Sequence, residues 1–275
     1  MISVGSLKNV KNVNSKERII ITPLKEKITS AAIFISLIVV FITSVNLLNL
    51  DFERFISRLE NLPNVISNFM SFNISAVPLG IQNLMVSVFL AFCGLVIGAV
   101  ISFILAFCGA SNTTFFKPLA VLIKSFVSLI RAVPNLVLIL MIVASIGIGY
   151  IAGVIALTLS SIGYLTKAFI ASIEEQDKCI EEALRTNGAT WFQIIYHGYL
   201  PNVWTHFLSW ISINLESNIS ASISLGIVGA GGIGMLINRA IRGSNHADLT
   251  TYITIIFIFL YVLEVLITNF KRRIK

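Results

Sequence analysis

The stretch at residues 181–201 reads EEALRTNGATWFQIIYHGYLP. Its first part is a run of polar, helix-favouring residues that stops at Gly188, where the lack of a side chain permits the positive φ of a tight turn. Thr190 and Gln193 then have the spacing of a capping box, in which a hydroxyl residue begins a helix and a Gln three positions later caps it in return. The stretch therefore predicts two short helices that meet at an angle.

The second short helix carries an apolar face, and Gly198 is expected to end it. Pro201 can then occupy the first turn of the helix that follows. The apolar face consists of four large side chains, Trp191, Phe192, Ile195 and Tyr196. On the water side of a membrane protein such a face needs a cover, which is either the protein's own spans or the groove of a soluble partner.

The composition places this loop in a membrane protein. Of 275 residues, 56% are hydrophobic and 12% are charged, and the mean hydropathy is +0.89. A soluble domain carries about 25% charged residues, so this chain has too few charges to cover a globular surface. At about 20 apolar residues per spanning helix, the chain has room for five or six spans and their connections.

The net charge of +7 is concentrated at the two ends of the chain. Six Lys and Arg residues lie in residues 1–28 and four more in the last five residues. Basic residues that flank apolar spans mark cytoplasmic segments, so this distribution argues against nucleic-acid binding. We expect a basic cytoplasmic segment at 1–28 and a transmembrane domain at 29–275. The apolar stretch from Thr29 is too long for a cleavable signal peptide.

Hydropathy and charge together predict an all-α, multi-pass topology. The expected spans are residues 30–50, 81–108, 134–146, 149–173, one that begins near 203, and 249–270. Residues 51–80 carry three acidic and two basic residues, and this loop should lie outside. Residues 174–201 and both termini should lie in the cytoplasm.

Residues 117–146 allow two interpretations. Lys117, Lys124 and Arg131 recur every seven residues and share one helical face, which favours an amphipathic helix on the cytoplasmic membrane surface, followed by a short span from Pro134. The alternative is one long kinked span over 116–146.

Residues 214–234 read NLESNISASISLGIVGAGGIG. Gly229, Gly231 and Gly234 match the spacing of a dinucleotide fingerprint, but that motif needs a preceding strand and an acidic residue about 20 positions later. Here the flanks are membrane helices, and Asp248 lies only 14 positions after Gly234. The segment instead predicts a broken or re-entrant helix, which transporters place beside the translocation path.

Glu216 lies in this segment within a predicted span. A carboxylate in a span is costly and usually faces a cavity or a partner, and the neighbouring serines and asparagines supply a polar wall. Two roles are open for Glu216: lining the path, or tying two spans together through hydrogen bonds. The candidate path residues are Glu216, Asn218, Ser220, Gly229, Gly231, Gly232 and Gly234.

The loop at 174–201 resembles the EAA loop of ABC importer permeases. The family pattern is Glu-Ala-Ala, three residues, Gly, nine residues, an aliphatic residue, any residue and Leu-Pro. The matching positions are Glu182, Ala183, Gly188, Leu200 and Pro201, and the departures are Leu184 and Gly198. The resemblance implies that these residues, with Leu184 at the second Ala position, form a coupling helix that docks on a separate ATPase.

The string at 216–234 resembles the phosphonate-importer branch of these permeases, as does the Arg131–Pro134 segment. The similarity extends over about residues 84–270. The branch commonly carries Arg at the position of Ser220, so the identity of the substrate stays open. The resemblance implies that a phosphonate or a related phosphorus oxyanion is moved across the cytoplasmic membrane by alternating access, and an amino acid or an osmolyte is the alternative cargo.

The resemblance implies a type I importer (MetI-like) permease fold with about six transmembrane helices in the bacterial cytoplasmic (inner) membrane. The implied partners are a pair of ABC ATPase subunits, an extracytoplasmic binding protein, lipid and a second permease copy. We expect a homodimer, with a heterodimer as the alternative. Gly94 and Gly98, which let helices approach closely, and the 216–234 segment are candidates for interface or path. Arg239 and Arg242 can meet either substrate or lipid headgroups. No cofactor is expected in this chain, because ATP and Mg belong to the ATPase.

Other classes of protein find little support. The chain has no Walker A sequence, no Gly-x-Ser-x-Gly elbow and no His pair with zinc spacing, and its three cysteines show no metal spacing. We therefore expect neither an enzyme nor a metal site. A passive channel or a structural membrane subunit is the remaining alternative, but it would not need an aromatic cytoplasmic loop.

Overall fold

The computed structural model describes residues 24–48 and 51–274, and their regular structure is helical throughout. The chain divides into two compact units, Met1–Leu62 and Pro63–Lys275. Most of the basic N-terminal segment at 1–28 lies outside the described residues. The predicted all-α class is confirmed for the described part.

The first unit contains a long apolar helix. α1 (Leu24–Leu47) is exposed on nearly all its described side chains, although it is strongly apolar. Such a helix is stable where lipid covers it, because its backbone groups are satisfied internally. It confirms the predicted first span. α2 (Phe52–Glu60) follows, with the Asp51 side chain accepting a hydrogen bond from the Arg54 backbone N–H at 3.1 Å.

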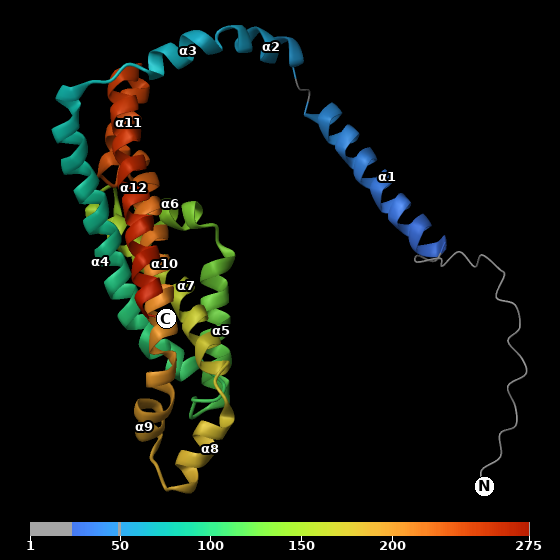
Figure 1. Ribbon diagram of the computed structural model, residues 1–275, viewed down its shortest axis with the longest axis vertical. Coiled ribbons are helices and arrows are strands. Elements are labelled where there is room, and N and C mark those ends of the chain that lie inside the picture. Colours follow the sequence, from blue (N-terminus) through green and yellow to red (C-terminus); the bar gives the residue numbers. More distant parts are fainter. Residues whose placement is uncertain (1–23, 49–50, 275) are drawn as a thin grey trace, which may run out of the picture. The chain divides into compact units, whose positions relative to one another are not determined.

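The second unit is a helical bundle (Figure 1). α3 (Leu62–Phe69) and a 3₁₀ turn lead into α4 (Val77–Gly109), which is antiparallel to α5 (Lys117–Ala132). The remaining helices are α6 (Asn135–Ile146), α7 (Tyr150–Glu174), α8 (Lys178–Thr186), α9 (Trp191–Gln193), α10 (Leu200–Ile227), α11 (Ile233–Arg242) and α12 (His246–Ile274). α4, α7 and α10 pack on one another in the centre, and α8 and α9 lie together at one end.

Among the described residues four helices are long and apolar enough to cross a membrane: α1, α4, α7 and α12. The bent pair α5 and α6 raises the number to five. α10 coincides with the predicted fifth span but is more polar, because its buried face carries Asn214, Asn218 and Ser222. Its 28 residues extend over about 42 Å, and its place between α4, α7, α11 and α12 shields that polarity from lipid.

The structure corrects the interpretation of residues 117–146. α5 does not lie apart as a surface helix, because it buries Ala120, Ile123 and Val127 against α4 and α7. The chain then bends by 91° into α6. The 12 residues of α6 reach only about 18 Å, too short for a span across a hydrocarbon core of about 30 Å. The break at Pro134 is confirmed, and it is far sharper than a kink.

Gly94 and Gly98 also find a different partner from the one proposed. A Cβ on Gly94 would lie 2.6 Å from Leu157 Cβ, and one on Gly98 would lie 2.5 Å from Ser161 Cβ. The close approach predicted from their spacing is therefore confirmed, but it joins α4 to α7 of the same chain. This face is buried and is not available to a second copy.

Candidate functional site

The loop at 174–201 folds as two short helices around a glycine turn, as predicted. Asp177 caps α8 by accepting a hydrogen bond from the Cys179 backbone N–H at 3.0 Å, and this bond lowers the pKa of the Asp177 carboxyl. Gly188 has φ of +76°, in the left-handed region that favours glycine. The Thr190 backbone N–H donates to Gln193 Oε1 at 2.7 Å, which confirms the capping interaction.

Gly198 does not end a helix, contrary to the prediction. α9 continues directly into a π-helix, Ile194–Tyr199, and from there into α10. Gly198 lies where this segment touches α8, and a Cβ there would approach Leu184 Cδ1 to 2.8 Å and Ile180 Cγ2 to 3.2 Å. The two departures from the EAA pattern thus contact each other, with a large residue at 184 matched by the smallest one at 198.

The EAA-like positions differ in exposure. Glu182, Ala183 and Gly188 are exposed, while Leu184 is half-buried against the hydrophobic core. Leu200 and Pro201 form the first turn of α10, with Leu200 half-buried and Pro201 exposed. The exposed positions can therefore meet a partner, and the half-buried ones join the loop to the bundle.

The protein itself covers one part of the apolar face of the loop and leaves another part exposed. Trp191 packs on Phe115 with ring centroids 4.1 Å apart, and its Nε1–H donates to the Thr113 carbonyl. Phe192 and Tyr196 are 75% and 65% exposed, although one edge of the Phe192 ring contacts Trp191, with ring centroids 4.8 Å apart. Phe192 lies in α9 and Tyr196 in the π-helix that continues it, and these two exposed side chains are called the aromatic patch below.

The loop is anchored to the ends of three long helices. Tyr199 is fully buried among residues of α4, α7 and α10, and its hydroxyl donates to Glu181 Oε2 at 3.1 Å. At the end of α7, Glu174 accepts hydrogen bonds from the Ser111 backbone N–H and from Lys124 Nζ, both at 2.6 Å. A force applied to the exposed patch would therefore reach α4, α7 and α10 together.

Tyr199 supplies a test of this anchoring. Burial, together with the bond to Glu181, raises the pKa of Tyr199 to about 12, so its hydroxyl remains a donor at neutral pH. Tyr199→Phe is expected to lower the free energy of unfolding by about 1 kcal/mol, because it removes one hydrogen bond while keeping the ring. Thermal unfolding in detergent at pH 7 measures the change. A melting temperature equal to that of the wild type would contradict the anchoring role.

The candidate path residues on α10 lie on two faces. Asn218 is buried, and its Nδ2 donates to Ser161 Oγ at 2.7 Å and to the Ala91 carbonyl at 3.5 Å, so it links α4, α7 and α10. Ser220 is exposed. Glu216 is half-buried, and no ion pair within residues 51–274 includes it. A role in the path for these residues stays a prediction.

The predicted helix break is present in the structure. α10 stops at Ile227, and Gly229, Gly231 and Gly232 all have positive φ before α11 begins. Gly234 belongs to α11 itself, where a side chain would strike the Ile223 carbonyl oxygen and the Gly226 Cα. The glycines therefore build a tight reversal, and whether they line a path stays a prediction.

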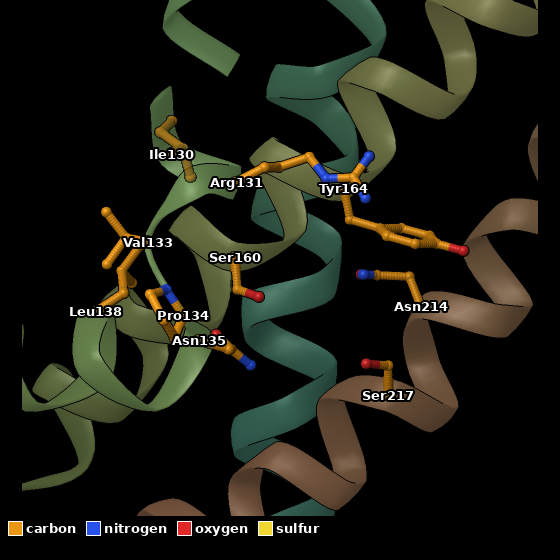
Figure 2. Close-up of a pocket in the computed structure, with 10 residues that line it drawn as sticks. All are labelled: Ile130, Arg131, Val133, Pro134, Asn135, Leu138, Ser160, Tyr164, Asn214 and Ser217. Carbon is orange, nitrogen blue, oxygen red and sulfur yellow. The ribbon is translucent and has the colours of Figure 1, made fainter. Parts of the chain in front are cut away.

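A pocket of about 270 Å³ lies between the α5–α6 bend, α7 and α10 (Figure 2). Its polar lining comes from Arg131, Asn135, Ser160, Tyr164, Asn214 and Ser217. Only Ser217 lies within the 216–234 segment predicted as interface or path, and the other five residues were not predicted as path residues. The signal for Arg131 was its seven-residue spacing from the lysines, and this was interpreted as a surface face. Within the described ranges no group of three His, Cys, Asp or Glu residues could hold a metal ion.

Comparison with known proteins supports one family. Residues 98–275 match the family described as "Binding-protein-dependent transport system inner membrane component". The chain is 32% identical over 183 residues to the "Phosphate-import permease protein PhnE" of Mycolicibacterium smegmatis, and the match covers 66% of this chain and 34% of the relative. It is 30% identical over 207 residues to the "Phosphite transport system permease protein PtxC" of Stutzerimonas stutzeri, with 75% of each chain covered. The match thus spans about a third of the mycobacterial relative.

A solved structure shares the fold. A chain of the MetNI methionine ABC transporter in an inward-facing conformation superposes with a TM-score of 0.62 at 22% identity. The match covers 74% of this chain and 97% of the other. The predicted MetI-like permease fold is therefore confirmed.

Proposed function

This chain belongs to the family of binding-protein-dependent transport system inner membrane components, and from this we propose that it is the permease subunit of an ATP-driven importer. The observation that carries the proposal is the loop at 174–201. Its EAA-like spacing coincides with an exposed aromatic patch, Phe192 and Tyr196, on a segment anchored to three long helices. A separate ATPase pair would dock there and hydrolyse ATP, and the permease itself would catalyse no reaction.

We further propose that the cargo is a phosphorus oxyanion such as a phosphonate, phosphite or phosphate. Two relatives that are 32% and 30% identical to this chain are named for phosphate import and phosphite transport. The alternative cargo is an amino acid, because the fold is shared with a methionine transporter. An extracytoplasmic binding protein would deliver the cargo.

A second permease copy would complete the path. α10 packs beside α4 and α12, which are candidate spans, so it lies at membrane depth. Even so, it exposes three serines at helical spacing, Ser217, Ser220 and Ser224. A row of serines on such a helix is poorly suited to lipid and fits either a water-filled path or a facing polar helix. We place both termini and residues 174–201 on the cytoplasmic side of the inner membrane, in agreement with the distribution of basic residues.

Uptake measurements test the proposed cargo. In a strain that lacks the gene, uptake of labelled methylphosphonate, phosphite or phosphate is expected to fall to background, and a plasmid copy should restore it. Methionine uptake should be unchanged. Loss of methionine uptake with normal oxyanion uptake would establish the alternative cargo, and no change in any of the four would contradict the importer.

A further inference from the structure

The pocket between α5, α7 and α10 lies near the middle of the bundle. Tyr164 and Asn214 are close to the midpoints of α7 (Tyr150–Glu174) and α10 (Leu200–Ile227), about 20 Å from either end of α10. Transporters place their substrate sites near this depth. The volume of about 270 Å³ is at the small end for ligand pockets and suits a small ion.

The pocket is electropositive. The Arg131 guanidinium lies over the Tyr164 ring, 5.9 Å from its centroid, and none of the ion pairs within residues 51–274 includes it. Arg131 is exposed, so its charge is available to an anion in the pocket, and a charged residue within a span usually faces a cavity or a path. α6 begins at the pocket, with Pro134 and Asn135 in its lining. Within the described part of the chain, no side chain caps its first N–H groups. The start of a helix attracts anions through these N–H groups.

Asn214 adds an acceptor to this positive environment. The Asn214 side chain lines the pocket (Figure 2) and is only 2% exposed, and among the residues that the structure describes its Oδ1 has no hydrogen-bond partner. A buried polar atom without a partner is costly, so a ligand that supplies a donor would remove the penalty. Asn218, equally buried one turn later on α10, has its amide engaged with Ser161.

We propose that this pocket is a transit site for a protonated phosphorus oxyanion. Arg131 and the first N–H groups of α6 bind the charged oxygens, and Asn214 Oδ1 accepts the hydrogen bond of the P–OH group. Phosphonates, phosphite and phosphate retain such a proton in part of their population near neutral pH. Sulfate does not, and it would leave Asn214 unsatisfied. The assignment rests on the proposed importer function. It adds which residues bind the cargo and which protonation state of the oxyanion they select.

The Arg131 contact is tested by uptake in cells that contain the full transporter. Arg131→Gln is expected to lower the uptake of labelled methylphosphonate at limiting concentration by about tenfold or more, as for loss of a charge-assisted hydrogen bond. Arg58→Gln in α2 removes the same charge far from the pocket in sequence and outside its lining, and it should retain wild-type uptake. Uptake by Arg131→Gln within twofold of the wild type would overturn the proposal.

Asn214 is tested against Asn218 as a matched control. Asn214→Leu removes an unsatisfied atom, so the melting temperature of the purified protein should stay the same or rise, while methylphosphonate uptake falls about tenfold. Asn218→Leu breaks a satisfied bond between helices and should lower the melting temperature. If Asn214→Leu instead lowered the melting temperature and spared uptake, Asn214 would be a packing residue and the proposal would fail.

Competition between unlabelled anions and labelled methylphosphonate, together with the pocket variants, tests the transit site separately from the proposed cargo. Excess unlabelled phosphite should compete with methylphosphonate for uptake, and excess sulfate should not. A wild-type transporter that imports no phosphorus oxyanion would refute the proposed cargo. A wild type that imports methylphosphonate, with both pocket variants equally active, would refute the transit site alone.

Discussion

Replacing Phe192 and Tyr196 together by serine is expected to abolish capture of the partner ATPase by the detergent-solubilised permease, and with it uptake. Both side chains are largely exposed, at 75% and 65%, and they lie four residues apart on the segment that carries the EAA-like spacing. Aromatic anchors buried at the centre of an interface often contribute about 2 kcal/mol or more each. The loss of two, about 4 kcal/mol, would weaken the complex by about 700-fold or more.

The design separates docking from folding. Neither side chain packs in the core of the chain, so the double variant should keep the wild-type melting temperature. Phe55→Ser removes an aromatic side chain of similar exposure, 60%, from α2, which is predicted to lie on the opposite side of the membrane, and it should not affect capture. Co-purification of normal amounts of ATPase with the double variant would show that the patch is not the docking surface.

Features of the loop that depend on neighbours in sequence could be predicted. The turn at Gly188 and the pairing of Thr190 with Gln193 are local, and both are present in the structure. The role of Gly198 could not be predicted in this way. A glycine is needed at position 198 because Leu184 approaches it from a different helix. In the sequence, a glycine that ends a helix cannot be told apart from one that makes room for a neighbouring side chain.

Close helix packing was predictable, but its partner was not. The spacing of Gly94 and Gly98 indicates a contact between helices, and the structure places that contact on α7 within the same chain. A small-residue face carries no information about whether its partner belongs to the same chain or to another copy. The glycine break after α10 was predictable because Gly229, Gly231 and Gly232 place three residues that disfavour a helix within four positions.

The pocket was missed because its residues come from segments far apart in sequence. Arg131, Tyr164 and Asn214 meet only when α5, α7 and α10 pack together. The regular spacing of Lys117, Lys124 and Arg131 suggested a uniform surface face. In the structure the last of them lies at the 91° bend, which exists because Pro134 separates two helices.

Gly198→Leu is expected to uncouple the loop, and Leu184→Ala in the same chain is expected to restore it. A side chain at 198 would collide with Leu184 Cδ1, 2.8 Å from its Cβ, and with Ile180 Cγ2 at 3.2 Å. Overpacking of this kind costs about 1–3 kcal/mol, and here it would push α8 away from the π-helix that leads into α10. Uptake by the single variant should therefore fall at least tenfold, with a lower melting temperature.

The double variant decides whether the two positions form a size-matched pair. Alanine at 184 and leucine at 198 exchange the large and the small residue, so both uptake and melting temperature should return close to wild type. Because the two residues touch, the double-mutant cycle should give a coupling energy of about 0.5–3 kcal/mol. Gly98→Leu is the matched control: it clashes with Ser161 on α7, and Leu184→Ala should not rescue it. If Leu184→Ala failed to rescue Gly198→Leu, the glycine would serve the π-helix itself rather than the contact with α8.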